Sequence, residues 1–240
     1  DVAREASDLV LLNDDFSSIV AAIRMGRRIF DNLKKAIAYI FAVHVPIAGM
    51  SFLPVLFHLP IVLLPAHIAF LELIIDPACS TVFESCREEK DIMKKPPRNL
   101  REKLFNRKAF IFSLLQGASI LAVVAIVYII SLYLHKGELE SRTLAFSTLV
   151  FANITLIITN LSWTQGFIKI IKSKNQALWW VVSVALIALI AVLYLPVLRN
   201  LFHFEFLTID DLAVTFLSGV ISLLWFEALK ALSKKSALDY

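Results

Sequence analysis

Two acidic residues, Glu72 and Asp76, lie inside an otherwise apolar stretch of the chain. A charged side chain at the centre of a membrane helix costs at least ~2.5–3.5 kcal/mol on insertion scales, so such residues usually have a function. Their spacing of four places both on one face of a helix, one turn apart. Two carboxylates facing the interior of a helix bundle form a hard-oxygen site for a cation. The alternative is that Asp76-Pro77 only ends the helix at the membrane surface. We favour the ion site, because Glu72 lies one turn deeper and residues 78–83 remain apolar.

Two prolines lie close to this candidate site in the sequence, and we predict that both are structural hinges. Pro77 has no amide hydrogen and clashes with the carbonyl four residues earlier. We therefore expect free carbonyls around Leu73–Asp76, and such carbonyls serve as further ligands where the backbone lines a cavity. Pro46 lies inside another apolar block and should bend that helix near the middle of the membrane.

Two further polar residues are candidate ligands, and each has an alternative interpretation. His44 is a ligand, a proton carrier or a counter-charge for Glu72, or else a neutral histidine bonded to a nearby carbonyl. Asn153 can supply an amide oxygen to a cation, although polar residues also link membrane helices to one another. The predicted metal ligands are Glu72, Asp76, Asn153 and His44.

Six apolar blocks must position these residues, each long enough to cross a hydrocarbon core about 30 Å thick. The chain is 58% hydrophobic, above the roughly 45–50% of soluble domains. We therefore predict an all-α membrane protein, a six-transmembrane-helix bundle that has lipid as its neighbour. The predicted spans are residues 36–58, 61–83, 109–134, 144–162, 177–198 and 212–232.

The first span continues a longer helix that projects out of the membrane. Asp14 or Asp15 can cap a helix at Phe16, and no Gly-Pro break follows before His58. A helix of about 43 residues is about 65 Å long, roughly twice the thickness of a bilayer. Its first half is amphipathic and basic, so we predict a long stalk in water on the first helix. The preceding residues 8–12 are predicted to form a strand.

The distribution of basic residues predicts the orientation of the bundle. Of the 24 Lys and Arg residues, all but Lys136, Arg142 and Arg199 lie on one side of the predicted spans. Cytoplasmic loops are enriched in Lys and Arg, so we expect a multi-pass membrane protein with both termini in the cytoplasm. The net charge of +4 is explained in the same way. We therefore expect no nucleic acid as a partner.

Three segments resemble cation-transporting P-type ATPases. The opening sequence DVAREASDLVLLNDDFSSIVAAIRMGRRIFDNLKKAI is similar to the end of the phosphorylation domain and the stalk of the fifth transmembrane helix. Asp91-Ile92-Met93 followed by Pro96-Pro97-Arg98 resembles the loop between helices six and seven, and Glu72–Asp76 corresponds to the ligand-bearing part of helix six. The resemblance implies that residues 1–27 are a remnant of the phosphorylation domain with the start of the stalk. Residues 28–240 are then the C-terminal transmembrane domain, with helices five to ten.

Within this family the chain is most similar to the subclass that includes calcium pumps. By this resemblance, His44 occupies the position of an asparagine ligand and Ile47 that of a carboxylate on helix five. Glu72 replaces an amide on helix six, Asp76 is retained, and Asn153 replaces a carboxylate on helix eight. The resemblance thus implies a transported cation, calcium-like and divalent or of another kind, and the loss of one of two calcium-type sites.

Motifs that carry the chemistry of the family are missing from the sequence. It contains no DKTGT phosphorylation motif, no TGES loop and no GDGxND magnesium site. We therefore expect no catalytic or cofactor-binding residues in this chain and no ATP hydrolysis by it alone. The resemblance implies that ATP and magnesium bind to a missing N-terminal half, its partner. That half contains helices one to four and the actuator, nucleotide-binding and phosphorylation domains.

The predicted function is the membrane half of an ATP-driven cation pump. It would supply the ion-binding residues and the stalk that couples phosphorylation to transport. One alternative is a non-catalytic remnant of a truncated pump, which would share every motif. Another is a stand-alone secondary carrier using Glu72, Asp76 and His44, although a carrier has no need of a long charged stalk.

Overall fold

The computed structural model describes residues 2–8, 10–12, 15–89, 92–94, 96–97, 107–162, 170–171 and 175–233. These residues form helices and connecting segments, which confirms the all-α class. The helices are α1 Val2–Glu5, α2 Phe16–Leu56, α3 Pro65–Pro77, the π-helix η1 Ala78–Phe83, α4 Arg107–Tyr133, α5 Glu138–Asn160, α7 Gln176–Tyr194, α8 Pro196–Leu201, α9 Ile209–Ile221 and α10 Leu224–Ser233.

The strand expected at residues 8–12 is wrong for the described part of that segment, which has no strand structure. A strand must pair its backbone groups with a neighbouring strand. The described residues offer no such neighbour.

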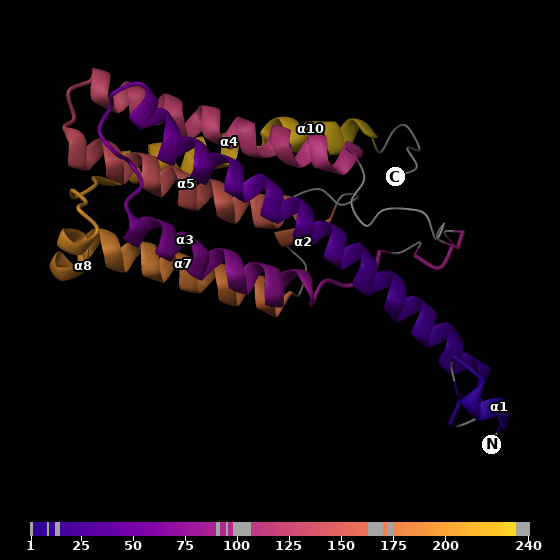
Figure 1. Ribbon diagram of the computed structural model, residues 1–240. Coiled ribbons are helices and arrows are strands. Elements are labelled where there is room, and N and C mark those ends of the chain that lie inside the picture. The colour runs from indigo at the N-terminus through magenta and orange to yellow at the C-terminus, as the bar shows by residue number, and fades with distance from the viewer. Residues whose placement is uncertain are drawn as a thin grey trace.

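Within the described residues, six helical segments are long and apolar enough to cross a membrane, as predicted. Two of them are composite. The second crossing runs from α3 into η1, and the sixth runs from α9 into α10. Figure 1 shows the bundle with α2 projecting far beyond one end, which we call the stalk end. This long first helix matches the predicted stalk.

Helix α5 lies at the centre of the bundle. Its membrane segment is 94% buried, against 22–44% for the other five crossings. It packs against α2, α4, α7 and α9, which cover it on all sides. The hydroxyl groups of Thr148 and Thr155 donate to carbonyls one turn earlier in the same helix, those of Leu144 and Phe151. A polar helix is therefore tolerated at the centre of an apolar bundle.

The ends of α2 follow local chemistry that the sequence displays. The carboxylate of Asp15 accepts the backbone N–H of Ser17 at 2.8 Å, which confirms the predicted N-cap. At the other end, His58 adopts a left-handed φ of 56°, and Leu59 N–H donates to the Pro54 carbonyl. This is the hydrogen bond that closes a Schellman-type helix end. Over its 41 residues, α2 continues through Pro46 without ending there.

Pro46 shapes the contact between α2 and α4. Because proline has no amide hydrogen, the carbonyl of Ala42 loses its usual helical donor. Gly117 of α4 packs directly over this carbonyl. A Cβ atom at Gly117 would lie 2.5 Å from the Ala42 oxygen and 2.6 Å from Val45 Cβ. Only glycine fits between the two helices at this point.

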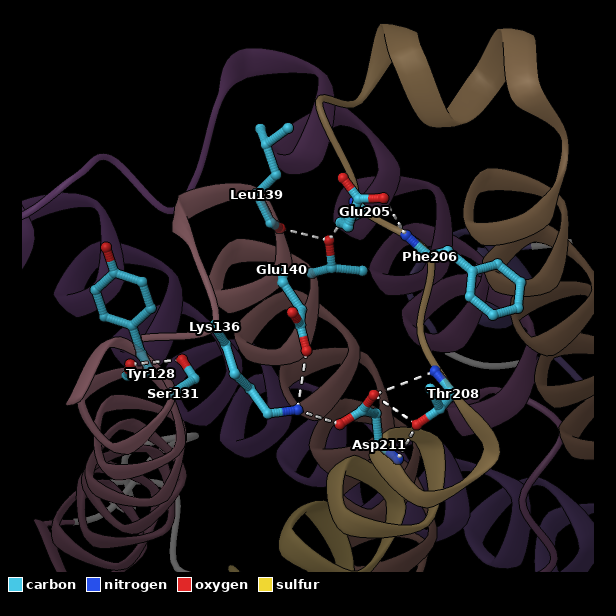
Figure 2. A network of polar contacts seen from close by, with 10 residues as sticks. Tyr128, Ser131, Lys136, Leu139, Glu140, Glu205, Phe206, Thr208 and Asp211 are labelled. Atoms are coloured by element: carbon cyan, nitrogen blue, oxygen red, sulfur yellow. Dashed lines mark hydrogen bonds and ion pairs between the residues drawn. The ribbon is translucent and has the colours of Figure 1, made fainter. Parts of the chain in front are cut away.

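A polar network fastens the bundle at the end opposite the stalk (Figure 2). The ammonium of Lys136 donates to Glu140 at 2.9 Å and to Asp211 at 2.5 Å. Asp211 also accepts the hydroxyl and the backbone N–H of Thr208, the N-cap of α9. The hydrogen bond to Asp211, followed by that to Glu140, raises the pKa of Lys136 above its ordinary value. The ion pairs thus join the α4–α5 loop to the start of α9.

Several residues used in the sequence predictions lie outside the described residues. They include Asp91 and Arg98 of the loop motif. The remaining members are basic residues counted for orientation: Lys90, Lys95, Arg101, Lys103, Lys169, Lys172, Lys174, Lys234 and Lys235.

We predict that Gly117→Ala destabilises the bundle by about 1–3 kcal/mol, the usual cost of forcing an extra carbon into a packed core. Gly49→Ala is the matched control, since its new Cβ would meet only the side chain of Leu121, which can rotate away. Thermal unfolding of the purified protein in detergent should show a clearly larger loss for Gly117→Ala. Equal losses for the two variants would contradict this account of the α2–α4 contact.

Candidate functional site

The two predicted carboxylates lie on α3, which begins at Pro65 and carries them in its second half. Glu72 is half-buried, with 40% of its side chain exposed, and Asp76 is exposed. Neither would be stable facing lipid. Both therefore lie on a side of α3 that the described helices leave open.

His44 of α2 meets Glu72 across this open face. Its Nε2 atom lies 3.8 Å from Glu72 Oε1, and its Nδ1 atom lies 2.8 Å from the carbonyl oxygen of Ile40. A carbonyl only accepts, so Nδ1 carries a hydrogen. The Nε2 atom then faces the Glu72 carboxylate at a distance longer than a hydrogen bond. The ring of His44 is thus bonded to a carbonyl and also faces Glu72.

The helix changes form directly after Asp76. Pro77 cannot donate to the carbonyl of Leu73, and residues 78–83 form a π-helix. The hydroxyl of Ser80 donates to the carbonyl of Asp76 at 2.8 Å. Single π-turns inside helices occur frequently at functional sites. The free carbonyls expected at Leu73–Asp76 are mostly occupied, because Ile74 and Ile75 accept the backbone N–H of Ala78 and Asp76 accepts the hydroxyl of Ser80. The irregular helix itself begins next to the acidic pair.

Asn153 lies on a different helix from this pair, α5. It is completely buried in α5, and neither its amide oxygen nor its amide nitrogen has a hydrogen-bond partner within the described residues. No hydrogen bond or ion pair among those residues links it to Glu72, Asp76 or His44. Asn153 stays a predicted ligand, and the described contacts join only Glu72 and His44. The described part of the chain contains no group of three or more His, Cys, Asp or Glu placed to hold a metal ion.

Residues in the stalk half of α2 bind the segment that follows η1. We call residues 84–89 the stalk-binding segment. Arg28 Nε donates to the carbonyl of Cys86 at 2.7 Å, and Asn32 Nδ2 donates to the same oxygen at 3.0 Å. Lys35 forms an ion pair with Glu89 at 3.2 Å. These three stalk residues lie on successive turns of one helix face.

The contacts between α2 and residues 84–89 are well shielded from water. The side chains of Lys35 and Glu89 are 5% and 16% exposed, so breaking the pair would leave a buried charge. Burial raises the pKa of the Cys86 thiol to about 11, which keeps it protonated and unreactive at neutral pH. Cys86 contributes through its carbonyl rather than its sulfur.

The sequence predictions missed these stalk contacts. The one available signal was the spacing of Arg28, Asn32 and Lys35 on the polar face of the predicted stalk. Their acceptors include backbone carbonyls, and a backbone carbonyl has no signature in the sequence.

Comparisons with known proteins show which family the chain resembles. A sequence model of the family described as "Cation transporting ATPase, C-terminus" matches residues 60–232. The "Calcium-transporting ATPase" of Bacillus subtilis is 32% identical over 213 residues, covering 88% of this chain and 24% of that protein. "Calcium-transporting ATPase 1" of Bacillus cereus is 30% identical and covers 98% of the chain and 28% of that protein.

A human relative, "Calcium-transporting ATPase type 2C member 1", is 28% identical over 92% of the chain and 24% of its own length. The chain thus spans about a quarter of the length of these relatives.

We predict that Asn32→Leu loosens the stalk-binding segment. The substitution removes the donor that reaches the carbonyls of Glu84 and Cys86, at a cost of about 1–3 kcal/mol for buried groups. Hydrogen exchange at residues 84–89 should therefore accelerate. Arg24→Met is the control. Arg24 makes an exposed ion pair with Glu88 at 3.7 Å, and such surface pairs contribute about 1 kcal/mol or less. A similar acceleration in both variants would contradict the assigned grip.

Proposed function

This chain belongs to the cation-transporting P-type ATPases, as their C-terminal membrane region, and from this premise we propose that it is the membrane half of an ATP-driven cation pump. The observation that carries the proposal is the position of Glu72, Asp76 and His44 on an open face at the start of an irregular helix. That helix leads directly into the segment that the stalk grips. ATP binding and phosphorylation are assigned to the part of the pump that the chain does not span.

In this proposal, Glu72 and Asp76 supply oxygen ligands to the transported cation. A calcium-like ion takes six to eight oxygens, so two carboxylates make only part of its shell. Helices from the other half of the pump would cover the open face and complete it.

The same proposal favours one cation rather than two. Ile47, at a position where the resemblance implies a carboxylate, is an apolar residue that is only 7% exposed. Asn153 is neutral and, among the described residues, makes no hydrogen bond to the acidic pair. A second site would therefore lack the negative charge that a divalent ion requires. The relatives named as calcium-transporting support calcium as the first ion to test.

Coupling would run from the stalk to the acidic pair through a short, continuous path. Movement of the stalk displaces Cys86 and Glu89, which Arg28, Asn32 and Lys35 hold. The stalk-binding segment continues η1, and η1 begins one residue after Asp76-Pro77.

A half-open apolar groove of about 170 Å³ next to Pro77, between α3 and α7, leaves room for α3 to shift. Pro77 would then act as the hinge of a two-state element driven by ATP, with Pro46 as a second hinge in α2.

We further propose that the stalk end is cytoplasmic. The described basic residues at this end include Arg24, Arg27, Arg28 and Lys35, and cytoplasmic loops are enriched in such residues. Both termini would then lie in the cytoplasm, and the pump would export its cation from there.

We predict that Glu72→Gln and Asp76→Asn each raise the cation concentration needed for phosphorylation of the full-length protein by about tenfold or more, because each removes a charged oxygen ligand. Phosphoenzyme formation from labelled ATP, titrated with calcium and then with other cations, provides the measurement. Glu140→Gln is the control. It removes a carboxylate of α5 that is bonded to Lys136 at the opposite end of the bundle.

Wild-type phosphorylation with unchanged cation dependence in both variants would show that the acidic pair is not the site. A wild-type protein that forms no cation-dependent phosphoenzyme would instead favour the remnant over the pump.

A further inference from the structure

Lys230 of α10 is a buried cation that lies on the end of another helix. Its side chain is 6% exposed, and its Nζ atom donates to the carbonyl of Thr159 and to Glu227 Oε1, the latter at 2.8 Å. Helix α5 ends at Asn160, so the Thr159 carbonyl belongs to the last turn, whose carbonyls lack helical donors. The carboxyl end of a helix also attracts positive charge. Lys230 therefore caps α5 from a helix far away in the sequence.

The same end of α5 is bonded to the stalk-binding segment. Ser162, two residues after the helix ends, donates to Glu89 Oε1 at 2.9 Å. That oxygen also accepts from Lys35 of the stalk at 3.2 Å. Two lysines and two carboxylates, counting Glu227, thus surround the carboxyl end of α5.

Helix α10 is a separate segment rather than a plain continuation of α9. The two helices are divided at Ser222 and Leu223, and the carbonyl of Ser222 accepts the hydroxyl of Ser119 in α4 at 2.9 Å. An apolar residue at position 230 would be enough to pack α10 against the bundle. A buried ammonium there costs free energy unless its partners stay in place, so it specifies one docked position of α10.

We propose that Lys230 is a positioning residue of the pump, which holds the carboxyl end of α5 so that Glu89 stays within reach of Lys35. This inference rests on the proposed function, because it gives α10 a part in the coupling path. With Lys230 in place, the stalk moves residues 84–89 while the end of α5 holds Glu89 through Ser162. Without it, the end of α5 loosens, Glu89 loses its support from Ser162, and stalk movement is absorbed before it reaches Asp76.

The test uses the full-length protein with Lys230→Met, Lys230→Arg and the double variant Lys230→Met/Glu227→Gln. The double variant also removes the charge of the carboxylate that Lys230 contacts and so protects folding. Lys136→Met is the matched control, since it breaks a lysine–carboxylate contact at the opposite end of the bundle. The two readouts are hydrogen exchange at residues 84–89 and the number of cations transported per ATP hydrolysed in proteoliposomes.

We expect Lys230→Met and the double variant to exchange about tenfold faster at residues 84–89, as local opening becomes easier by about one hydrogen bond to a charged group. Transport per ATP should fall at least about threefold, as for a loosened coupling element. Lys230→Arg should restore both readouts, and Lys136→Met should change neither.

Unchanged exchange in the Lys230→Met variants, or an equal change in Lys136→Met, would overturn the inference. Faster exchange with unchanged transport per ATP would overturn it as well, because Lys230 would then support the segment without acting in coupling. A wild-type protein without ATP-driven transport would instead contradict the proposed function. In that case hydrogen exchange still decides whether Lys230 holds the segment.

Discussion

Hydrocarbon offers no hydrogen bonds, so each polar group within the membrane-crossing helices needs a partner inside the protein. Helix α5 shows how far this requirement is met. Thr148 and Thr155 bond to their own helix, and Asn160 donates to the carbonyl of Leu156. The requirement is not met everywhere, since the side chains of Ser141, Ser147 and Asn153 in α5 are buried and have no partner among the described residues. Glu72 differs from these buried groups, because it faces His44 across a gap of 3.8 Å on an open face. In the proposed pump, that open face is where further helices would bind.

The two ends of the bundle use charge differently. At the end opposite the stalk, Lys136 bonds to residues of α5 and α9, which pack against each other along the membrane. Those ion pairs fasten loops. At the stalk end, Lys35 and Glu89 join a helix that projects beyond the bundle to a segment that leads back to Asp76. The contacts are similar in kind. The difference lies in packing. Helices α5 and α9 already pack against each other, whereas the projecting part of α2 and residues 84–89 are joined mainly by these polar contacts, so such a contact can transmit force.

Hydropathy and local chemistry were enough to predict the six crossings, the Asp15 cap and the helix end before His58. The fourth crossing begins at Glu138, earlier than expected, since Arg142 looks like a loop residue in the sequence.

In the structure Arg142 donates to the carbonyl of Ile61 and to Glu138, so it is buried with its charge satisfied. The stalk grip was missed for a related reason, because it depends on backbone acceptors brought close by tertiary structure. The sequence predicts which residues are unusual, and the fold decides which of them meet.

The open face of α2 and α3 links assembly to ion binding in the proposed pump. Half of the His44 side chain and 40% of the Glu72 side chain are exposed there, at a depth where lipid would otherwise contact them. Helices from the other half of the pump would remove these groups from lipid and, by the same contact, add ligands around the cation. Two binding events that use one surface are thermodynamically coupled. A bound cation should then strengthen the association of the two halves, and tighter association should raise the affinity for the cation. Ion binding would in this way stabilise the arrangement of helices on which the stalk acts.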